Sequence, residues 1–155
     1  PLPAHAWPAV VIDVHDGDTI TVRRSNGQTE RLRLYGIDAP ELAQPGGTDA
    51  ADHLLELLHD GTAEVRTMDR DRYGRTVARI WTIDGQDVNE AMVADGHAWL
   101  YAQYCKAPSP CAGWLVQMVR AAIGGSGLWS GSDLTPPWDW RKARRQRAEA
   151  STTEE

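Results

Sequence analysis

The sequence has few cysteines, no long apolar run and no excess of positive charge. Its 155 residues contain no stretch of about 18 apolar side chains, so no membrane segment is expected. A net charge of −6 disfavours a protein that coats nucleic acid, because many phosphate contacts would require a surplus of Lys and Arg. An enzyme that holds one or two phosphates and then releases them is less restricted. The composition therefore favours catalysis over storage.

Only two cysteines occur, Cys105 and Cys111, in a short segment that also contains proline. Two cysteines without a neighbouring His or further Cys make a poor zinc site. A disulfide between them would fit an oxidising compartment. We therefore favour a disulfide and a secreted or cell-envelope location, and two unpaired, partly buried thiols are the alternative.

One globular domain is expected, because a chain of this length with 41% hydrophobic residues can form one packed core. β-branched runs and alternating apolar residues indicate five strands, and apolar residues at helical spacing indicate three helices. The expected strands cover residues 9–14, 19–23, 31–35, 63–68 and 76–83, and the expected helices cover residues 48–60, 88–94 and 112–123.

This order of elements predicts an α+β fold, a five-stranded OB-fold β-barrel with three packed helices. The predicted domain covers residues 1–133. Residues 134–155 contain Pro and Trp, then a basic run and a polar end, which is typical of a tail that is mobile at its end. Two interpretations of the basic run remain open, a solvated tail and a segment that attracts phosphates.

Two acidic segments look ordinary when each is taken alone. Residues 16–19 read Asp-Gly-Asp-Thr, a favoured turn, and residues 37–41 read Ile-Asp-Ala-Pro-Glu, a strand end before a helix. However, Asp18 shares strand parity with Ile20, and Asp38 shares it with Leu34, so both carboxylates should reach one end of the barrel. Two such carboxylates repel unless a cation lies between them, and oxygen ligands suit calcium or magnesium. The sequence therefore predicts a hard divalent metal site, which the Ala39 carbonyl could complete.

Two arginines accompany these carboxylates, and each could be a solvent-facing charge. Arg33 lies on an alternating strand, and Arg75 follows a turn. A metal site, the further carboxylate of Glu41 and two guanidinium groups are together what in-line attack on a phosphodiester requires.

The segments Asp16 to Thr19, Arg33 to Glu41 and Asp71 to Arg75 resemble the thermonuclease, or staphylococcal nuclease, family in sequence, spacing and order. The resemblance extends over about residues 10–130. It implies that Asp18, Asp38 and the Ala39 carbonyl bind Ca²⁺, with Asp16 in support. It further implies the following roles: Glu41 activates the attacking water, Arg33 and Arg75 hold the scissile phosphate, and Arg72 and Tyr73 contact a neighbouring phosphate.

The resemblance also implies DNA and RNA substrates, a preference for unpaired strands and products that carry 3′-phosphates. The segment after Glu41 is short and lacks the lysines of the best-known member, and Ala102 stands where a family tyrosine would align. Tyr104 is the favoured residue for stacking on a base, with Tyr101 as the other candidate.

The function expected from the sequence is a monomeric, calcium-dependent nuclease. Two alternatives remain, a noncatalytic OB-fold module that binds nucleic acid or protein, and an enzyme that acts on a smaller phosphodiester.

Overall fold

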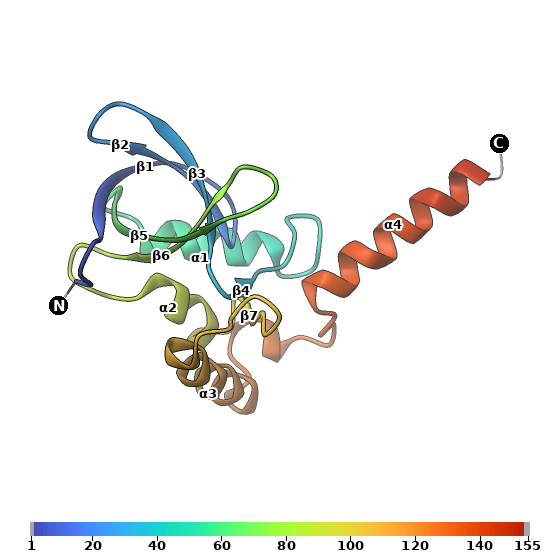
Figure 1. Cartoon of the computed structure of the whole chain (residues 1–155). Coiled ribbons are helices and arrows are strands. Elements are labelled where there is room, and N and C mark those ends of the chain that lie inside the picture. Colours follow the sequence, from blue (N-terminus) through green and yellow to red (C-terminus); the bar gives the residue numbers. More distant parts are fainter. Residues whose placement is uncertain (1, 154–155) are drawn as a thin grey trace.

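Five strands form a closed barrel in the computed structural model, which describes residues 2–153 (Figure 1). They are β1 (Trp7–Asp16), β2 (Thr19–Arg24), β3 (Thr29–Leu34), β5 (Thr62–Arg70) and β6 (Thr76–Trp81). Their order around the barrel is β1-β2-β3-β6-β5, and β1 closes it against β5. All neighbours are antiparallel except β3 and β6, which run parallel. The predicted five-stranded barrel in an α+β fold is therefore confirmed.

The interior of the barrel consists of the alternating apolar residues of its strands. Ile20 and Val22 of β2 are fully buried, as are Leu32 and Leu34 of β3. Side chains of a strand alternate between its two faces, so the polar residues between them point outward. Asp18 precedes Ile20 by two residues and is accordingly on the inward face at the end of the barrel.

Helices and a second small sheet lie at one end and side of this barrel (Figure 1). A two-residue strand, β4 (Ile37–Asp38), pairs with β7 (Trp99–Leu100), and Asp38 lies opposite Trp99. The helical elements are α1 (Gly47–Leu57), α2 (Val88–Ala94), α3 (Pro108–Gly124), the 3₁₀ helix η1 (Gly127–Ser130) and α4 (Pro137–Thr153).

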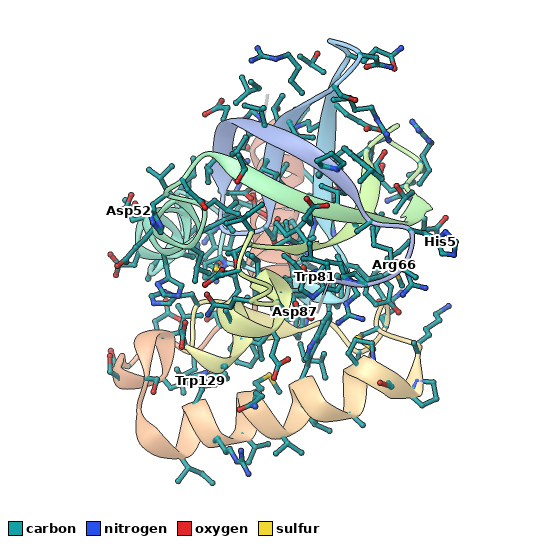
Figure 2. The ribbon with its side chains drawn as sticks, turned by 90° about the vertical axis from the view of Figure 1, so that its left-hand side faces the viewer. His5, Asp52, Arg66, Trp81, Asp87 and Trp129 are labelled. Atoms are coloured by element: carbon teal, nitrogen blue, oxygen red, sulfur yellow. A yellow bond between two sulfur atoms is a disulfide. The ribbon has the colours of Figure 1, made fainter. Side chains whose placement is uncertain are left out.

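Helix α2 is fixed to the barrel by polar contacts. Asp87 caps the helix by accepting a hydrogen bond from the backbone N–H of Glu90, and it lies beside Trp81 of β6 in Figure 2. The fully buried Asn89 accepts a hydrogen bond from the N–H of Ile80 and donates one to the Tyr35 carbonyl. Asn89 thus satisfies backbone groups at the ends of two strands, one of which leads towards Asp38.

The predicted disulfide is present, between Cys105 and Cys111. It packs on Gly36, which has a φ of 72°, and a Cβ atom there would lie 2.7 Å from the Cys105 sulfur. The indole of Trp114 from α3 contacts the same glycine and is buried. The disulfide and α3 therefore hold the turn that connects β3 to Asp38.

The C-terminal segment differs from the sequence-based expectation, because it contains a fourth α-helix. Helix α4 begins at Pro137, a favoured first position of a helix, and its run of Arg, Lys, Gln and Ala has high helix propensity. Figure 1 shows α4 directed away from the barrel. Within residues 2–153, no helix has the length and apolar character needed to cross a membrane.

Candidate active site

A tight turn between β1 and β2 carries the first two acidic residues. The backbone N–H of Asp18 donates a hydrogen bond to Asp16 Oδ1 at 3.0 Å, and the Thr19 hydroxyl donates one to Asp18 Oδ1 at 3.0 Å. Gly17 lets this turn pack closely, because a Cβ atom there would lie 2.7 Å from the Cβ atoms of both Ala39 and Ala50. The turn therefore presses Asp18 against the segment that follows β4.

The second acidic segment meets the first at this point. The N–H of Ala39 donates a hydrogen bond to Asp18 Oδ2 at 2.7 Å. The whole residue Asp18 is 5% exposed and Asp38 is 1% exposed. The structure thus brings together two buried carboxylates from segments about 20 residues apart, as expected, but Asp38 lies in β4, beyond the turn at Gly36, and not on a continuation of β3 as the parity argument assumed.

Arg33 lies between these two carboxylates. Its Nη2 atom is 3.3 Å from Asp18 Oδ2 and 3.2 Å from Asp38 Oδ1, and its Nη1 atom donates to the Leu34 carbonyl at 3.0 Å. Strand parity did not predict that the Arg33 side chain points towards these two carboxylates. The pairing of Arg33 with Thr19 across β2 and β3 places the guanidinium beside the turn that carries Asp18.

Two carboxyl groups of this cluster, Asp16 and Asp38, have a raised pKa and are harder to ionise than free carboxyls. Burial, together with the charge of Asp18, raises the pKa of Asp16 to about 7. Burial also raises the pKa of Asp38 to about 6, although Arg141 and Arg33 lie against it and favour its charged form. Positive charge brought to this cluster would lower both values, which is the expected behaviour of carboxylates suited to a cation.

Glu41 lies three residues beyond Asp38, at the edge of the cluster, and is about one-third exposed. The buried side chain of Gln44 fixes the backbone of Glu41 by accepting a hydrogen bond from the Glu41 N–H at 3.2 Å. The Gln44 amide also donates to the Thr135 carbonyl at 2.8 Å. Gln44 therefore connects the Glu41 loop to the segment before α4. Nothing in the sequence marked Gln44 for this contact, because a lone Gln in a loop carries no pattern.

Arg141 of α4 also reaches the cluster, about 100 residues further along the chain. Its Nη2 atom donates to Asp38 Oδ2 at 2.7 Å, and its Nη1 atom is 3.1 Å from Asp38 Oδ1 and 3.0 Å from Glu41 Oε1. This bidentate contact with one carboxylate is among the strongest hydrogen-bonding arrangements of a guanidinium group. The sequence placed Arg141 in a basic tail and gave no signal for a position in the site.

Arg75 is held outside this cluster, in the loop between β5 and β6. Its Nε atom donates to Asp71 Oδ2 at 2.7 Å, and Asp71 also accepts hydrogen bonds from the N–H groups of Tyr73 and Arg75. Within residues 2–153, Arg75 forms no hydrogen bond or ion pair with Asp18, Asp38 or Glu41. It is next to Thr76, which pairs with Leu32 of β3, so the loop begins beside the strand that carries Arg33.

The predicted substrate-contacting residues lie on the surface. Arg72 and Tyr73 are exposed in the β5–β6 loop, and the Arg72 guanidinium is 5.0 Å from the centre of the Tyr73 ring. Tyr104 is 55% exposed in the loop after β7, with its ring 4.7 Å from that of Tyr101. Tyr101 also stacks on Trp138 of α4 at 5.1 Å. Tyr104 is therefore the more accessible of the two tyrosines.

The donor set of the cluster fits a hard cation that keeps several waters. Two carboxylates, Asp18 and Asp38, converge on one nitrogen of Arg33, so they already share a positive partner. No group of three or more His, Cys, Asp or Glu side chains in the described range 2–153 is arranged as a metal site. A cation bound here would therefore need a backbone carbonyl and water in addition, as calcium accepts.

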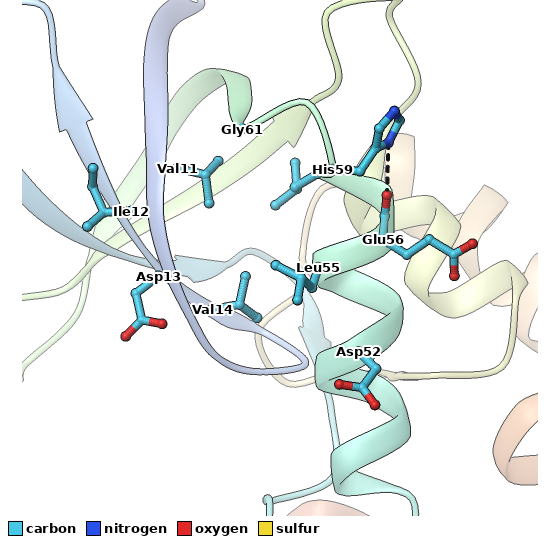
Figure 3. Close-up of a pocket in the computed structure, with 10 residues that line it drawn as sticks. Val11, Ile12, Asp13, Val14, Asp52, Leu55, Glu56, His59 and Gly61 are labelled. Carbon is cyan, nitrogen blue, oxygen red and sulfur yellow. Dashed lines mark hydrogen bonds between the residues drawn. The ribbon is translucent and has the colours of Figure 1, made fainter.

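A separate hollow of about 610 Å³ lies between β1 and α1 (Figure 3). Apolar side chains line most of it, including Val11, Val14 and Leu55. None of the cluster residues belongs to its lining. The hollow and the carboxylate cluster are therefore separate features of the molecule.

Comparison with known proteins identifies relatives of this chain. Residues 31–131 match the family model described as staphylococcal nuclease homologue. An uncharacterized endonuclease of Escherichia coli O157:H7 is 39% identical over 143 residues, which cover 88% of this chain and 90% of that protein. An uncharacterized endonuclease of Haemophilus influenzae is 32% identical over 135 residues, covering 87% and 73%. A staphylococcal-like nuclease of Arabidopsis thaliana is 38% identical over 115 residues, covering 74% of this chain and 34% of the plant protein.

The family match includes the part of β3 that carries Arg33, β4 with Asp38, and also Glu41 and Arg75. The relative from Escherichia coli extends the similarity over nearly the whole chain. The barrel, the acidic turn and these comparisons agree, and the chain belongs to the staphylococcal nuclease homologue family.

Proposed function

We propose that the protein is a calcium-dependent nuclease that hydrolyses phosphodiester bonds in DNA and RNA, with a preference for unpaired strands. One observation carries the proposal: Arg33 lies within 3.3 Å of Asp18 and 3.2 Å of Asp38, and Glu41 follows at the open edge of the same cluster. Membership of a family that includes nucleases supports it.

In this proposal, Asp18 and Asp38 bind the calcium ion, the Ala39 carbonyl provides a further oxygen, and Asp16 supports the turn. All donors are oxygens, which suits calcium better than a softer metal. Bound calcium would offset the charge of the buried carboxylates and withdraw negative charge from the phosphate.

Glu41 is the proposed general base. Its carboxylate accepts the proton of the attacking water, the water oxygen bonds to phosphorus, and the bond between phosphorus and the 5′ oxygen breaks. The departing 5′ oxygen takes a proton from solvent water, so the products are a 3′-phosphate and a 5′-hydroxyl. Glu41 suits this task because it is more exposed than the two buried aspartates, so water can approach its carboxylate.

The two arginines act on the phosphate in this scheme. Arg33 binds the scissile phosphate and stabilises negative charge on the departing 5′ oxygen, and Arg75 binds a second oxygen of the same group. Asp71 holds Arg75 through Nε, so the Nη groups remain for the phosphate. Arg72 and Tyr73 would contact the neighbouring phosphate, and Tyr104 would stack on a base.

Replacing Arg141 with Gln should tighten calcium binding by about tenfold. The guanidinium holds Asp38 through two hydrogen bonds. A cation that needs Asp38 must displace this contact, and a hydrogen bond to a charged group contributes about 1.5–3 kcal/mol. Isothermal titration calorimetry with calcium measures the change. Arg145→Gln, which removes the same charge one turn away, is the matched control. Equal calcium affinities for wild type and both variants would show that Arg141 does not compete.

The disulfide supports an oxidising compartment, and we propose a secreted or cell-envelope location. We also propose that the protein acts as a monomer, because the cluster takes all of its charged residues from one chain.

Incubation with single-stranded DNA and with RNA tests the proposed function. Both polymers should be cut in calcium, and removal of calcium with a chelator should stop the reaction, because the buried carboxylates then repel the phosphate. Gel electrophoresis and end-group analysis follow the products, which should carry 3′-phosphates. Two intact polymers together with measurable binding would instead favour the noncatalytic OB-fold module.

A further inference from the structure

Helix α4 concentrates positive charge on a protein that is otherwise acidic. It carries five of the 16 Lys and Arg residues but only two of the 22 Asp and Glu residues. Its formal charge is therefore +3, while the remainder of the chain sums to −9. A separation of charge this large is the usual electrostatic signature of a surface that binds a polyanion.

The first turn of α4 is fixed to the body of the protein beside the active-site cluster. The Trp138 ring stacks on Tyr101 at 5.1 Å and meets Trp99 edge-on at 5.8 Å. Arg141 then reaches Asp38 and Glu41. The direction in which α4 leaves the cluster is therefore set by packing and ion pairs at its base.

Helical geometry places two more arginines on the face that Arg141 presents to the cluster. Arg144 and Arg145 follow Arg141 by three and four residues, so they lie on the same side of the helix. The rise per residue puts them roughly 4.5 and 6 Å further along the axis. Lys142 and Arg147 lie roughly 100° and 120° around the helix axis from Arg141, on its two flanks. Apart from Arg141, all of these basic side chains are exposed.

We propose that Arg144 and Arg145, together here named the basic face, bind the phosphate backbone of the nucleic-acid strand next to the position where it is cut. This inference rests on the proposed nuclease function and extends it. The strand would pass from the cluster along α4, where the basic face meets its next phosphates. Guanidinium groups suit this role because they form paired hydrogen bonds with phosphate oxygens.

The exposed part of α4 argues against a membrane surface as its partner. A helix that lies on a lipid surface needs a broad apolar face opposite its basic one. Between residues 142 and 153 the only apolar side chains of α4 are alanines. A nucleic-acid strand requires no apolar face, since its phosphates dominate the contact.

Binding of a short fluorescent single-stranded DNA, measured by anisotropy against salt concentration, tests the basic face. Every protein carries Glu41→Gln so that the DNA stays intact. The double substitution Arg144→Gln/Arg145→Gln should weaken binding by about tenfold at low salt. It should also reduce the slope of log affinity against log salt by about 1.4, since each lost phosphate contact on a single strand accounts for about 0.7.

The matched control is Lys142→Gln/Arg147→Gln, which removes the same charge from the two flanks of the same helix, away from the side of Arg141. It should leave both the affinity and the salt slope close to those of the parent. An equal loss in both double variants would show a general charge effect and overturn the proposal, as would no loss in either. The proposal would also be overturned if the basic-face variant lost affinity for anionic vesicles but kept its affinity for DNA.

Failure of this inference can be told apart from failure of the proposed function. If the wild type cuts DNA in calcium but the Arg144→Gln/Arg145→Gln variant binds as its parent does, the basic face is wrong and the nuclease assignment stands. If the wild type does not cut and the basic-face variant still loses binding, the nuclease assignment is wrong. In that case α4 remains a nucleic-acid contact.

Discussion

Glu41→Gln should lower kcat on single-stranded DNA by about 10²–10⁴-fold, the usual contribution of a positioned general base. Glutamine keeps the size and hydrogen-bonding shape of the side chain but cannot take the proton of the attacking water. The Glu41 backbone is held by Gln44, so the loop should keep its position in the variant. Calcium affinity should change much less than kcat, because the two buried aspartates are the proposed ligands.

The measurement is initial-rate kinetics with calcium in excess, combined with calorimetry of calcium binding. Glu56→Gln on α1 makes the same chemical change at an exposed position and should keep full activity. A Glu41→Gln variant that cuts DNA as fast as Glu56→Gln would exclude Glu41 as the base. A variant that loses calcium binding entirely would assign Glu41 to the metal instead.

Arg33→Gln should lower kcat by about 10²–10³-fold, as expected when one donor to a charge-developing oxygen is removed. It should also destabilise the calcium-free protein by about 3 kcal/mol. The guanidinium lies against two buried carboxylates, and removing one partner of a buried ion pair leaves charge without compensation.

Urea unfolding with and without calcium separates the two effects. Calcium should restore most of the lost stability, because a cation at Asp18 and Asp38 replaces the missing positive charge. It should not restore kcat, because the contact with the phosphate is lost. Arg31→Gln is the control, as Arg31 lies on the same strand with an exposed side chain. If Arg33→Gln matched this control in rate and in stability, Arg33 would have no role in the site.

Local patterns in the sequence were sufficient to predict the five-stranded barrel. The alternation of Ile20 and Val22, and of Leu32 and Leu34, fixes which face of each strand is buried, because the side-chain period of a strand is two residues. The same parity placed Asp18 at one end of the barrel. These features depend only on neighbours along the chain and on one buried face, so they can be read without a structure. Asp38 reaches the same end from β4, beyond the turn at Gly36, where the parity of β3 no longer applies.

Local patterns were less successful wherever a boundary depended on tertiary contacts. Helix α3 begins at Pro108, four residues before its predicted start, in the segment tied by the disulfide. Helix α4 was not expected, although Pro137 and the run of Arg, Lys, Gln and Ala favour a helix locally, and tertiary contacts decide only where it lies. Its base is held by Trp138 and Arg141, and only their partners elsewhere in the chain give those residues a fixed place.

The sequence by itself determined the five-strand barrel, the family motifs and the two acidic segments that meet in space, because spacing and strand parity encode them. Only the tertiary structure decided that the Arg33 side chain points towards Asp38, that Gln44 contacts Thr135, and that Arg141 forms an ion pair with Asp38. The physical reason is the same in each case. A long polar side chain can take many directions from one backbone position, and barrel closure and distant packing select one of them.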